Sequence, residues 1–158
     1  MGKVAVGMKA SSFELKNQFG ERFTSEEQLG NWLVAFIYTG AQTPRYAAGM
    51  LALRDHYDEF IEEGVSVVAI STATEKEHLR FAAQYGIRFQ LLSDTKRDVA
   101  RRFGVSSQYF GLAGGRLALL IDPQGVICHV SEDKGKNMVS EMLSLVKQRN
   151  QAGLMLAS

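Results

Sequence analysis

The sequence has 158 residues, 18 basic and 17 acidic side chains and a single cysteine, Cys128. This length corresponds to one domain, which we expect to span residues 1–158, and one cysteine excludes an intramolecular disulfide or a zinc site built on several thiolates. A net charge of +1 without a long basic run argues against a nucleic-acid surface, and no apolar stretch is long enough for a membrane helix.

The first half of the sequence alternates between strand and helix patterns. Two short alternating segments, Ser12–Leu15 and Glu21–Thr24, predict a β-hairpin. The apolar run Trp32–Tyr38 is typical of a central strand covered on both faces. Apolar residues then recur at helical spacing between a proline and a glycine, which predicts one helix from Arg45 to about Glu63.

The second half continues this alternation and adds a hairpin and a last helix. The predicted elements are, in chain order, a strand at Val65–Ile70, a helix at Glu75–Tyr85, a short strand at Leu91–Leu92, a short helix at Asp98–Phe103, a loop at Ser106–Gly115, two strands of a hairpin at Leu117–Ile121 and Val126–Val130, and a helix from about Lys136 to Gln148. We expect the tail, residues 150–158, to fray.

This order of elements predicts an α/β fold with a central mixed sheet, helices on both faces and an N-terminal β-hairpin. The sequence does not support a dinucleotide-binding fold, because no GxGxxG motif follows the first buried strand. The sequence also has no Walker motif. We expect no cofactor and no metal.

In such a sheet, ligands bind at the carboxyl ends of strands, beside the N-termini of the following helices. The segment Thr39–Tyr46 occupies this place. It offers the Thr43 hydroxyl, the backbone N–H groups of Arg45 and Tyr46, and the Arg45 side chain to an anion. The alternative is that the segment is only the capped start of a helix.

Several short motifs follow one another in an order that is specific although each motif is weak. With them the sequence resembles peroxiredoxins of the alkyl hydroperoxide reductase and thiol-specific antioxidant family, closest to the bacterioferritin comigratory protein or Q-type branch, from about Val6 to Val146. The motifs are Leu33–Tyr38 leading into Thr43 and Pro44, Leu53–Asp55 with Tyr57 and Phe60, Gly64–Ser71, His78, Phe81 and Ala82, Tyr85–Ile87, Leu91–Asp94, Phe103–Val105, Gly115 and Arg116, and Leu120–Asp122.

The resemblance implies a thioredoxin-like fold and descent from thiol peroxidases. Members of this family carry a peroxidatic cysteine in the first turn of the helix after the central strand, with a proline and a threonine before it and a distant arginine beside it. By this pattern Thr43 matches the threonine and Arg116 the arginine, but Thr39 occupies the proline position and Tyr46 the cysteine position. Leu51 stands where many members of the branch keep a resolving cysteine.

A phenol with a pKa of about 10 is a poor nucleophile toward peroxide and cannot form a sulfenic acid. We therefore expect no catalytic residues among Thr39, Thr43, Tyr46 and Arg116, and a role in binding, regulation or assembly with a protein partner or as a homodimer. Thr43, Arg45, Tyr46 and Arg116 remain a candidate site for a small anion. The alternative is an active antioxidant oxidoreductase that uses Cys128 or a partner's thiol.

The thiol and two histidines have simpler interpretations. Strand alternation puts Ile127 and His129 on one face of the predicted hairpin strand and Cys128 on the other. A lone cysteine on a strand is most often packed, so a redox role for Cys128 is the alternative. His56 and His78 lack a ligand partner four residues on, which favours solvent-exposed or capping roles over metal binding.

The start of the chain, Met1–Val4, lacks the apolar region and the cleavage site of a signal peptide. We expect a cytoplasmic protein. The chloroplast stroma is the alternative if the sequence is a trimmed mature chain.

Overall fold

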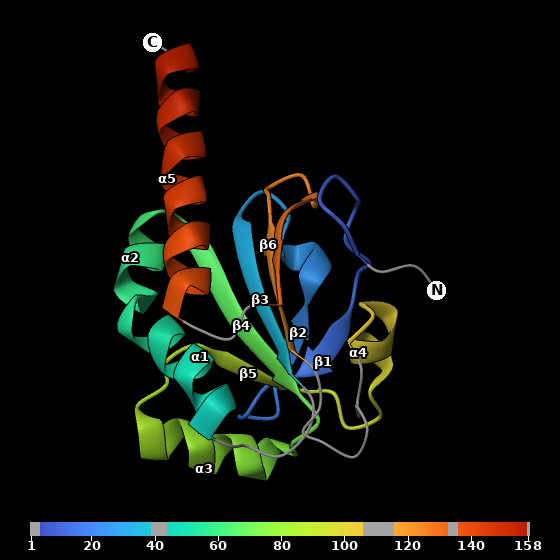
Figure 1. The fold of residues 1–158 in the computed structure, drawn as a ribbon. Helices are drawn as coiled ribbons and strands as arrows, with labels where there is room; N and C mark the ends of the chain where they lie inside the picture. Colours follow the sequence, from blue (N-terminus) through green and yellow to red (C-terminus); the bar gives the residue numbers. More distant parts are fainter. Residues whose placement is uncertain (1–3, 39–43, 106–115, 133–135, 158) are drawn as a thin grey trace.

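The apolar run of the sequence forms β3 (Trp32–Tyr38), which lies inside the sheet of the computed structural model (Figure 1). The structure describes residues 4–38, 44–105, 116–132 and 136–157. The other elements are, in chain order, β1 (Glu14–Lys16), β2 (Arg22–Thr24), the 3₁₀ helix η1 (Ser25–Gln28), α1 (Pro44–Asp55), α2 (Tyr57–Glu62), β4 (Val65–Ser71), α3 (Glu75–Tyr85), β5 (Gln90–Ser93), α4 (Asp98–Arg102), β6 (Arg116–Ile121), β7 (Ile127–Ser131) and α5 (Lys136–Ala157).

These strands form one mixed sheet in the order β2-β1-β5-β4-β3-β6-β7. β3, β4 and β5 run parallel to one another, whereas β6 pairs with β3, and β7 with β6, in the antiparallel sense. β1 and β2 form the predicted N-terminal hairpin. The expected α/β fold with a central mixed sheet is therefore confirmed, and the predicted loop at 106–115 lies outside the described residues.

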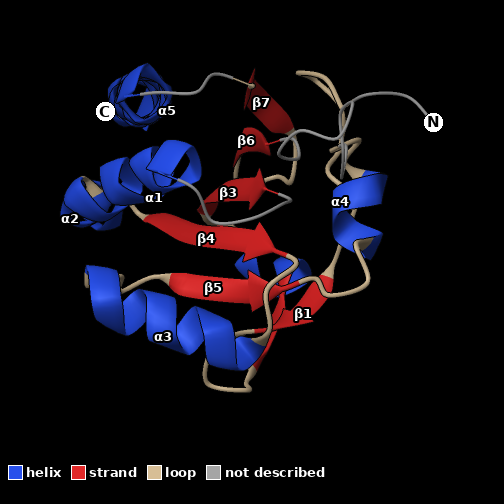
Figure 2. Ribbon diagram, turned by 60° about the horizontal axis from the view of Figure 1, so that its bottom comes forward, coloured by secondary structure: helices blue, strands red, loops and turns tan. Residues whose placement is uncertain are grey.

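Helices cover both faces of the sheet (Figure 2). Side chains of α1, α2, α3 and α5 pack with Val34, Phe36 and Tyr38 of β3. The intervening residues Leu33, Ala35 and Ile37 point to the opposite face, where α4 and the N-terminal hairpin cover them. This alternation explains why β3 is apolar at every position, since both of its faces are buried.

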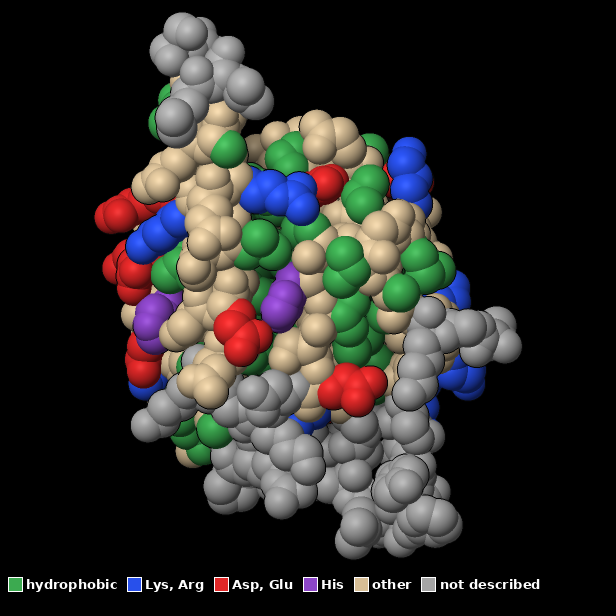
Figure 3. All heavy atoms as spheres, turned by 45° about the horizontal axis from the view of Figure 1, so that its top comes forward, with side chains coloured by type: hydrophobic (Ala, Val, Ile, Leu, Met, Phe, Trp, Pro, Cys, Tyr) green, Lys and Arg blue, Asp and Glu red, His purple; other side chains and the backbone are tan. Residues whose placement is uncertain are grey.

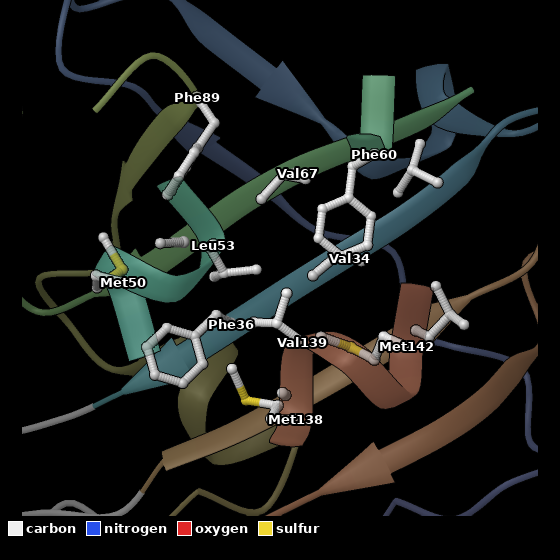
Figure 4. Packing of buried hydrophobic residues seen from close by; sticks show 14 of the residues in the cluster. Val34, Phe36, Met50, Leu53, Phe60, Val67, Phe89, Met138, Val139 and Met142 are labelled. Atoms are coloured by element: carbon white, nitrogen blue, oxygen red, sulfur yellow. The ribbon is translucent and has the colours of Figure 1, made fainter. Parts of the chain in front are cut away.

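The larger core brings together residues from distant parts of the chain. Figure 4 shows Met50 and Leu53 of α1 and Met138, Val139 and Met142 of α5 on the side of the sheet that carries Val34 and Phe36. All of them are at most 2% exposed. Burying a side chain of this size stabilises a fold by roughly 1.5–3 kcal/mol, so this contact holds α5 against the sheet.

The helix predicted from Arg45 to Glu63 is in fact two helices, α1 and α2, interrupted at His56. The backbone of His56 leaves the helical region at φ −105° and ψ 9°. Its ring nitrogen Nδ1 lies 3.0 Å from the carbonyl oxygen of Ala52, which also accepts the His56 backbone N–H. A break of one residue leaves the apolar spacing almost unchanged, and periodicity therefore did not reveal it.

The last helix was predicted to end near Gln148, and this is wrong because α5 continues to Ala157. Asn150 gives the physical reason. Its Oδ1 accepts a hydrogen bond from Trp32 Nε1 at 3.1 Å, and its Nδ2 donates to the backbone oxygen of Glu63 at 3.1 Å. These bonds tie α5 to the start of β3 and the end of α2, so the helix is still anchored beyond Gln148. Fraying of residues 150–158 stays a prediction.

Candidate functional site

The sequence-predicted site lies at the carboxyl end of β3, where α1 begins. β3 ends at Tyr38 and α1 starts at Pro44. Thr39 and Thr43 lie outside the described residues. Arg45 and Tyr46 belong to the first turn of α1, although their side chains lie outside the described part of the chain. The predicted strand and the helix that follows it are therefore present in the order that the site requires.

Sheet pairing brings Arg116 to this place. Arg116 is the first residue of β6, and it pairs directly with Tyr38, the last residue of β3. The Arg116 side chain is half-buried and has an interaction partner. A residue that is far away in the sequence thus lies beside the last residue of β3, at the end of the strand where the candidate anion site is predicted.

A glycine lets α1 approach the sheet closely. A Cβ atom added to Gly49 would lie 3.0 Å from the end of the Phe36 ring, and Phe36 is itself packed on Tyr38 with ring centroids 5.5 Å apart. A side chain at position 49 would push α1 away from β3. Leu51 of the same helix is half-buried. The close packing of Gly49 against Phe36 therefore helps to position the start of α1, which lies about one and a half turns earlier.

His78 lies in a different environment from the solvent-exposed or capping one that the sequence predicted. It is 1% exposed rather than solvent-exposed or capping, and it lies on the inner face of α3. Its ring nitrogens Nε2 and Nδ1 lie 2.6 Å from Ser71 Oγ and 3.1 Å from Ser93 Oγ. Burial lowers the pKa of His78 to about 4. A neutral His78 therefore joins α3 to the carboxyl ends of β4 and β5.

The spacing of apolar residues along α3 indicates that His78 lies on the buried face of the helix. Phe81, Ala82 and Tyr85 follow His78 at intervals of a helical face, and Phe81 and Ala82 are buried. His78 stands on the same face, one turn earlier. The second histidine that we interpreted as exposed or capping, His56, is half-buried and contacts the Ala52 carbonyl.

Cys128 and His129 point to the same face of the sheet, contrary to the expected alternation. The β6–β7 register shifts between Leu120 and Ile121, so β7 carries a bulge. Cys128 belongs to the core that includes the buried residues of α5. His129 Nε2 lies 3.4 Å from Glu141 Oε2 of α5. The bulge turns two successive side chains toward α5.

The environment of Cys128 is that of a packed thiol. It is 9% exposed, and its Sγ donates to the backbone oxygen of Leu120 at 3.4 Å. Burial raises the pKa of the Cys128 thiol, and the nearby charge of Arg149 opposes this shift. Since the thiolate is the reactive form, these surroundings make Cys128 a weak nucleophile.

We therefore expect Cys128 in the folded chain to react with a thiol-specific disulfide reagent at least roughly tenfold more slowly than in the urea-unfolded chain, because reaction requires local opening. The measurement is the labelling rate at fixed pH with and without urea. Equal rates in the two states would contradict the packed position.

The described surface has few other features of a catalytic centre. Among the described residues, no group of three or more His, Cys, Asp or Glu side chains could hold a metal ion, and no helix is long and apolar enough to cross a membrane. On the face shown in Figure 3, Lys and Arg side chains are scattered among hydrophobic and neutral ones. A hollow of about 150 Å³ lies near the start of β3, at the other end of this strand, and is lined partly by Phe13, Leu33 and Ile121.

The mixed sheet, its helices and the strand-to-helix site define a thioredoxin-like α/β protein. The sequence matches the AhpC/TSA family over residues 6–130, and the chain belongs to this family.

Individual relatives agree with this assignment. The chain is 30% identical over 148 residues to the chloroplastic peroxiredoxin Q of Triticum aestivum, and the match covers 92% of this chain and 68% of the wheat protein. It is 34% identical over 125 residues to the chloroplastic peroxiredoxin Q of Populus jackii, covering 79% of this chain and 59% of the poplar protein. The crystal structure of peroxidoxin BcpB from Mycobacterium tuberculosis matches with a TM-score of 0.81 and 28% identity, covering 90% of this chain and 96% of that one.

Proposed function

We propose that this member of the AhpC/TSA family lacks thiol peroxidase activity and acts in binding, regulation or assembly. The observation that carries the proposal is Tyr46 in the first turn of α1, the position that the family resemblance gives to the peroxidatic cysteine. A phenol has no sulfur to oxidise, so the reaction that forms a sulfenic acid has no starting group here. Leu51 supplies no resolving thiol either.

The buried position of Cys128 supports the same proposal. Cys128 lies on β7, whereas Tyr46 lies at the start of α1. Burial raises the pKa of the Cys128 thiol. An oxidoreductase that uses Cys128 would need an exposed thiolate. A partner's thiol entering the site is the remaining route to redox chemistry.

The test is a coupled assay with hydrogen peroxide and a reducing thiol. We expect the wild-type chain to show no turnover above a control without protein, and Cys128→Ser to leave this result unchanged. Turnover that Cys128→Ser abolishes would overturn the proposal in favour of the oxidoreductase alternative.

A weak site for a small anion or carboxylate is the binding function that this place favours. The first turn of α1 offers backbone N–H groups, which attract negative charge, and the β3–β6 pairing brings Arg116 to the same edge of the sheet. We propose Thr43, Arg45, Tyr46 and Arg116 as its residues. A protein carboxylate, from a partner or from a second copy of this chain, presents the same chemistry.

We expect acetate, sulfate or benzoate to shift the backbone amide resonances of Thr43, Arg45 and Tyr46 in a saturable titration, because an anion at a helix N-terminus changes the field at those N–H groups. Arg116→Met is the matched variant and should weaken the titration. Amide shifts of Thr43, Arg45 and Tyr46 that stay unmoved would exclude the anion site.

For the compartment we propose the cytoplasm. The chloroplast stroma is the alternative, because the wheat and poplar relatives are named as chloroplastic.

A further inference from the structure

A groove opens where the sheet ladder between β1 and β5 ends. These two strands pair only at Lys16 and Ser93. The chain then turns away from β1, because the Asp94 N–H donates to the Ser71 backbone oxygen at 2.7 Å and the Asp94 carboxylate accepts hydrogen bonds from the first turn of α4. The space that remains, about 810 Å³, lies between β1, the start of α3 and the segment after β5.

Basic side chains from separate elements converge on this groove. Lys16 of β1, Lys76 of α3 and Lys96 of the segment after β5 line it, and all three are exposed. Within the part of the chain that the structure describes, none of the three forms an ion pair. We call this feature, with its three lysines, the basic groove.

The acidic residues of the basic groove do not neutralise these lysines. Glu14 lies 3.6 Å from Arg22, which also lines the groove, so these two charges offset each other. Glu75 is the other carboxylate in the described lining. The groove therefore keeps an excess of positive charge although the whole chain carries a net charge of only +1.

The N-terminus of α3 is a poor phosphate-binding site, because side chains of the helix itself already bind its first backbone N–H groups. Thr74 Oγ1 accepts the Glu77 N–H at 3.2 Å, and Glu77 Oε1 accepts the Thr74 N–H at 3.0 Å, which forms a capping box. The Glu77 carboxylate thus already lies where an anion would meet the helix dipole. Attraction in the groove comes instead from lysines, which are flexible point charges without the bidentate geometry that fixes a phosphate.

We propose that the basic groove binds an extended acidic segment of a partner protein. Lysines from three different elements spread their charge along an open groove, which suits several carboxylates in a row better than one compact anion. None of the groove residues belongs to the candidate site at Tyr46. The inference therefore goes beyond the proposed function and does not depend on whether the chain reduces peroxide.

Fluorescence anisotropy with a labelled hexaglutamate peptide tests the proposal. At low salt we expect saturable binding that weakens as salt is added, because screening shortens the reach of exposed charges. Lys76→Glu and Lys96→Glu should each weaken binding by about three- to tenfold, since each replaces an attraction by a repulsion. All of these side chains are exposed, so the variants should keep the wild-type thermal unfolding curve.

The matched control is Lys9→Glu, which makes the same charge change at an exposed lysine that pairs with Val126 and does not line the basic groove. It should change binding by less than about twofold. No binding to the wild type, or an equal loss in Lys9→Glu, would overturn the proposal. Inorganic polyphosphate is the competing probe: binding of polyphosphate that depends on Lys76 and Lys96, without binding of the peptide, would make the groove a phosphate site and also overturn it.

Discussion

Replacing Tyr46 by cysteine is expected to give this chain a reactive thiol that it now lacks. In a Cys128→Ser background, the Tyr46→Cys thiol should titrate about 0.5 to 1.5 units below the ordinary cysteine pKa of about 8.5, because the first turn of α1 offers backbone N–H groups and the helix dipole. Arg116 pairs with Tyr38, the last residue of β3, and adds positive charge at this end of the strand. Both effects favour the thiolate, which is the form that attacks peroxide.

The measurement is thiolate absorbance against pH, together with consumption of hydrogen peroxide in the presence of dithiothreitol. Ala83→Cys in the same background is the matched control, because Ala83 is exposed in the last turn of α3, away from a helix start. We expect its thiol to titrate no lower than an ordinary cysteine, because the C-terminal end of a helix disfavours negative charge, and to react slowly. Adding Arg116→Met to Tyr46→Cys should raise the thiol pKa again.

A Tyr46→Cys thiol that titrates no lower than the Ala83→Cys thiol would mean that the site has lost its other activating groups as well. Rapid peroxide consumption would mean that the surroundings of the old thiol site persist, and that Tyr46 alone blocks the chemistry. The two outcomes therefore distinguish a site that has lost only its thiol from a site that has also lost the groups that activate a thiol.

Acid is expected to destabilise the fold through His78. The folded chain holds the pKa of His78 at about 4, whereas the ordinary value is 6.5. The unfolded chain therefore binds the proton first, and stability falls as the pH drops from 6.5 toward 4. A difference of this size corresponds to about 3 kcal/mol of unfolding free energy, fully present above pH 6.5 and lost near pH 4.

His78→Asn tests this expectation, because asparagine keeps hydrogen-bonding groups but does not titrate. At neutral pH the variant should lose about 1–3 kcal/mol, since Ser71 and Ser93 no longer share one well-placed partner. Between neutral pH and about 4, its stability should fall less steeply than that of the wild type. Urea unfolding at several pH values measures both effects. His56→Asn is the control and should keep the wild-type pH dependence. Parallel pH profiles for wild type and His78→Asn would exclude this source of acid sensitivity.

Local patterns in the sequence were enough for most of the elements. The bounds of β3 and α3 were predicted to the residue, because a doubly buried strand and a helix with a capping threonine and a terminal glycine leave strong local signals. The hairpin of β6 and β7 was visible in the turn at Asp122–Gly125 for the same reason. The place of the candidate site followed from the strand-to-helix order.

Contacts between distant residues decided the rest. The pairing of β6 with β3 brings Arg116 to Tyr38, and no local pattern contains this contact. One bulge turns both Cys128 and His129 toward α5, which strand alternation alone could not show. Asn150 extends α5 through bonds to Trp32 and Glu63.

By itself, the sequence determined the order of the strands and of most helices, the α/β class and the absence of sulfur at positions 46 and 51, because these depend on residue type and local periodicity. Only the tertiary structure decided that the one thiol is packed, that His78 is a buried neutral link between α3 and two strands, and that three lysines share a groove. Burial and convergence depend on which elements pack together, and they become defined only when the sheet is assembled.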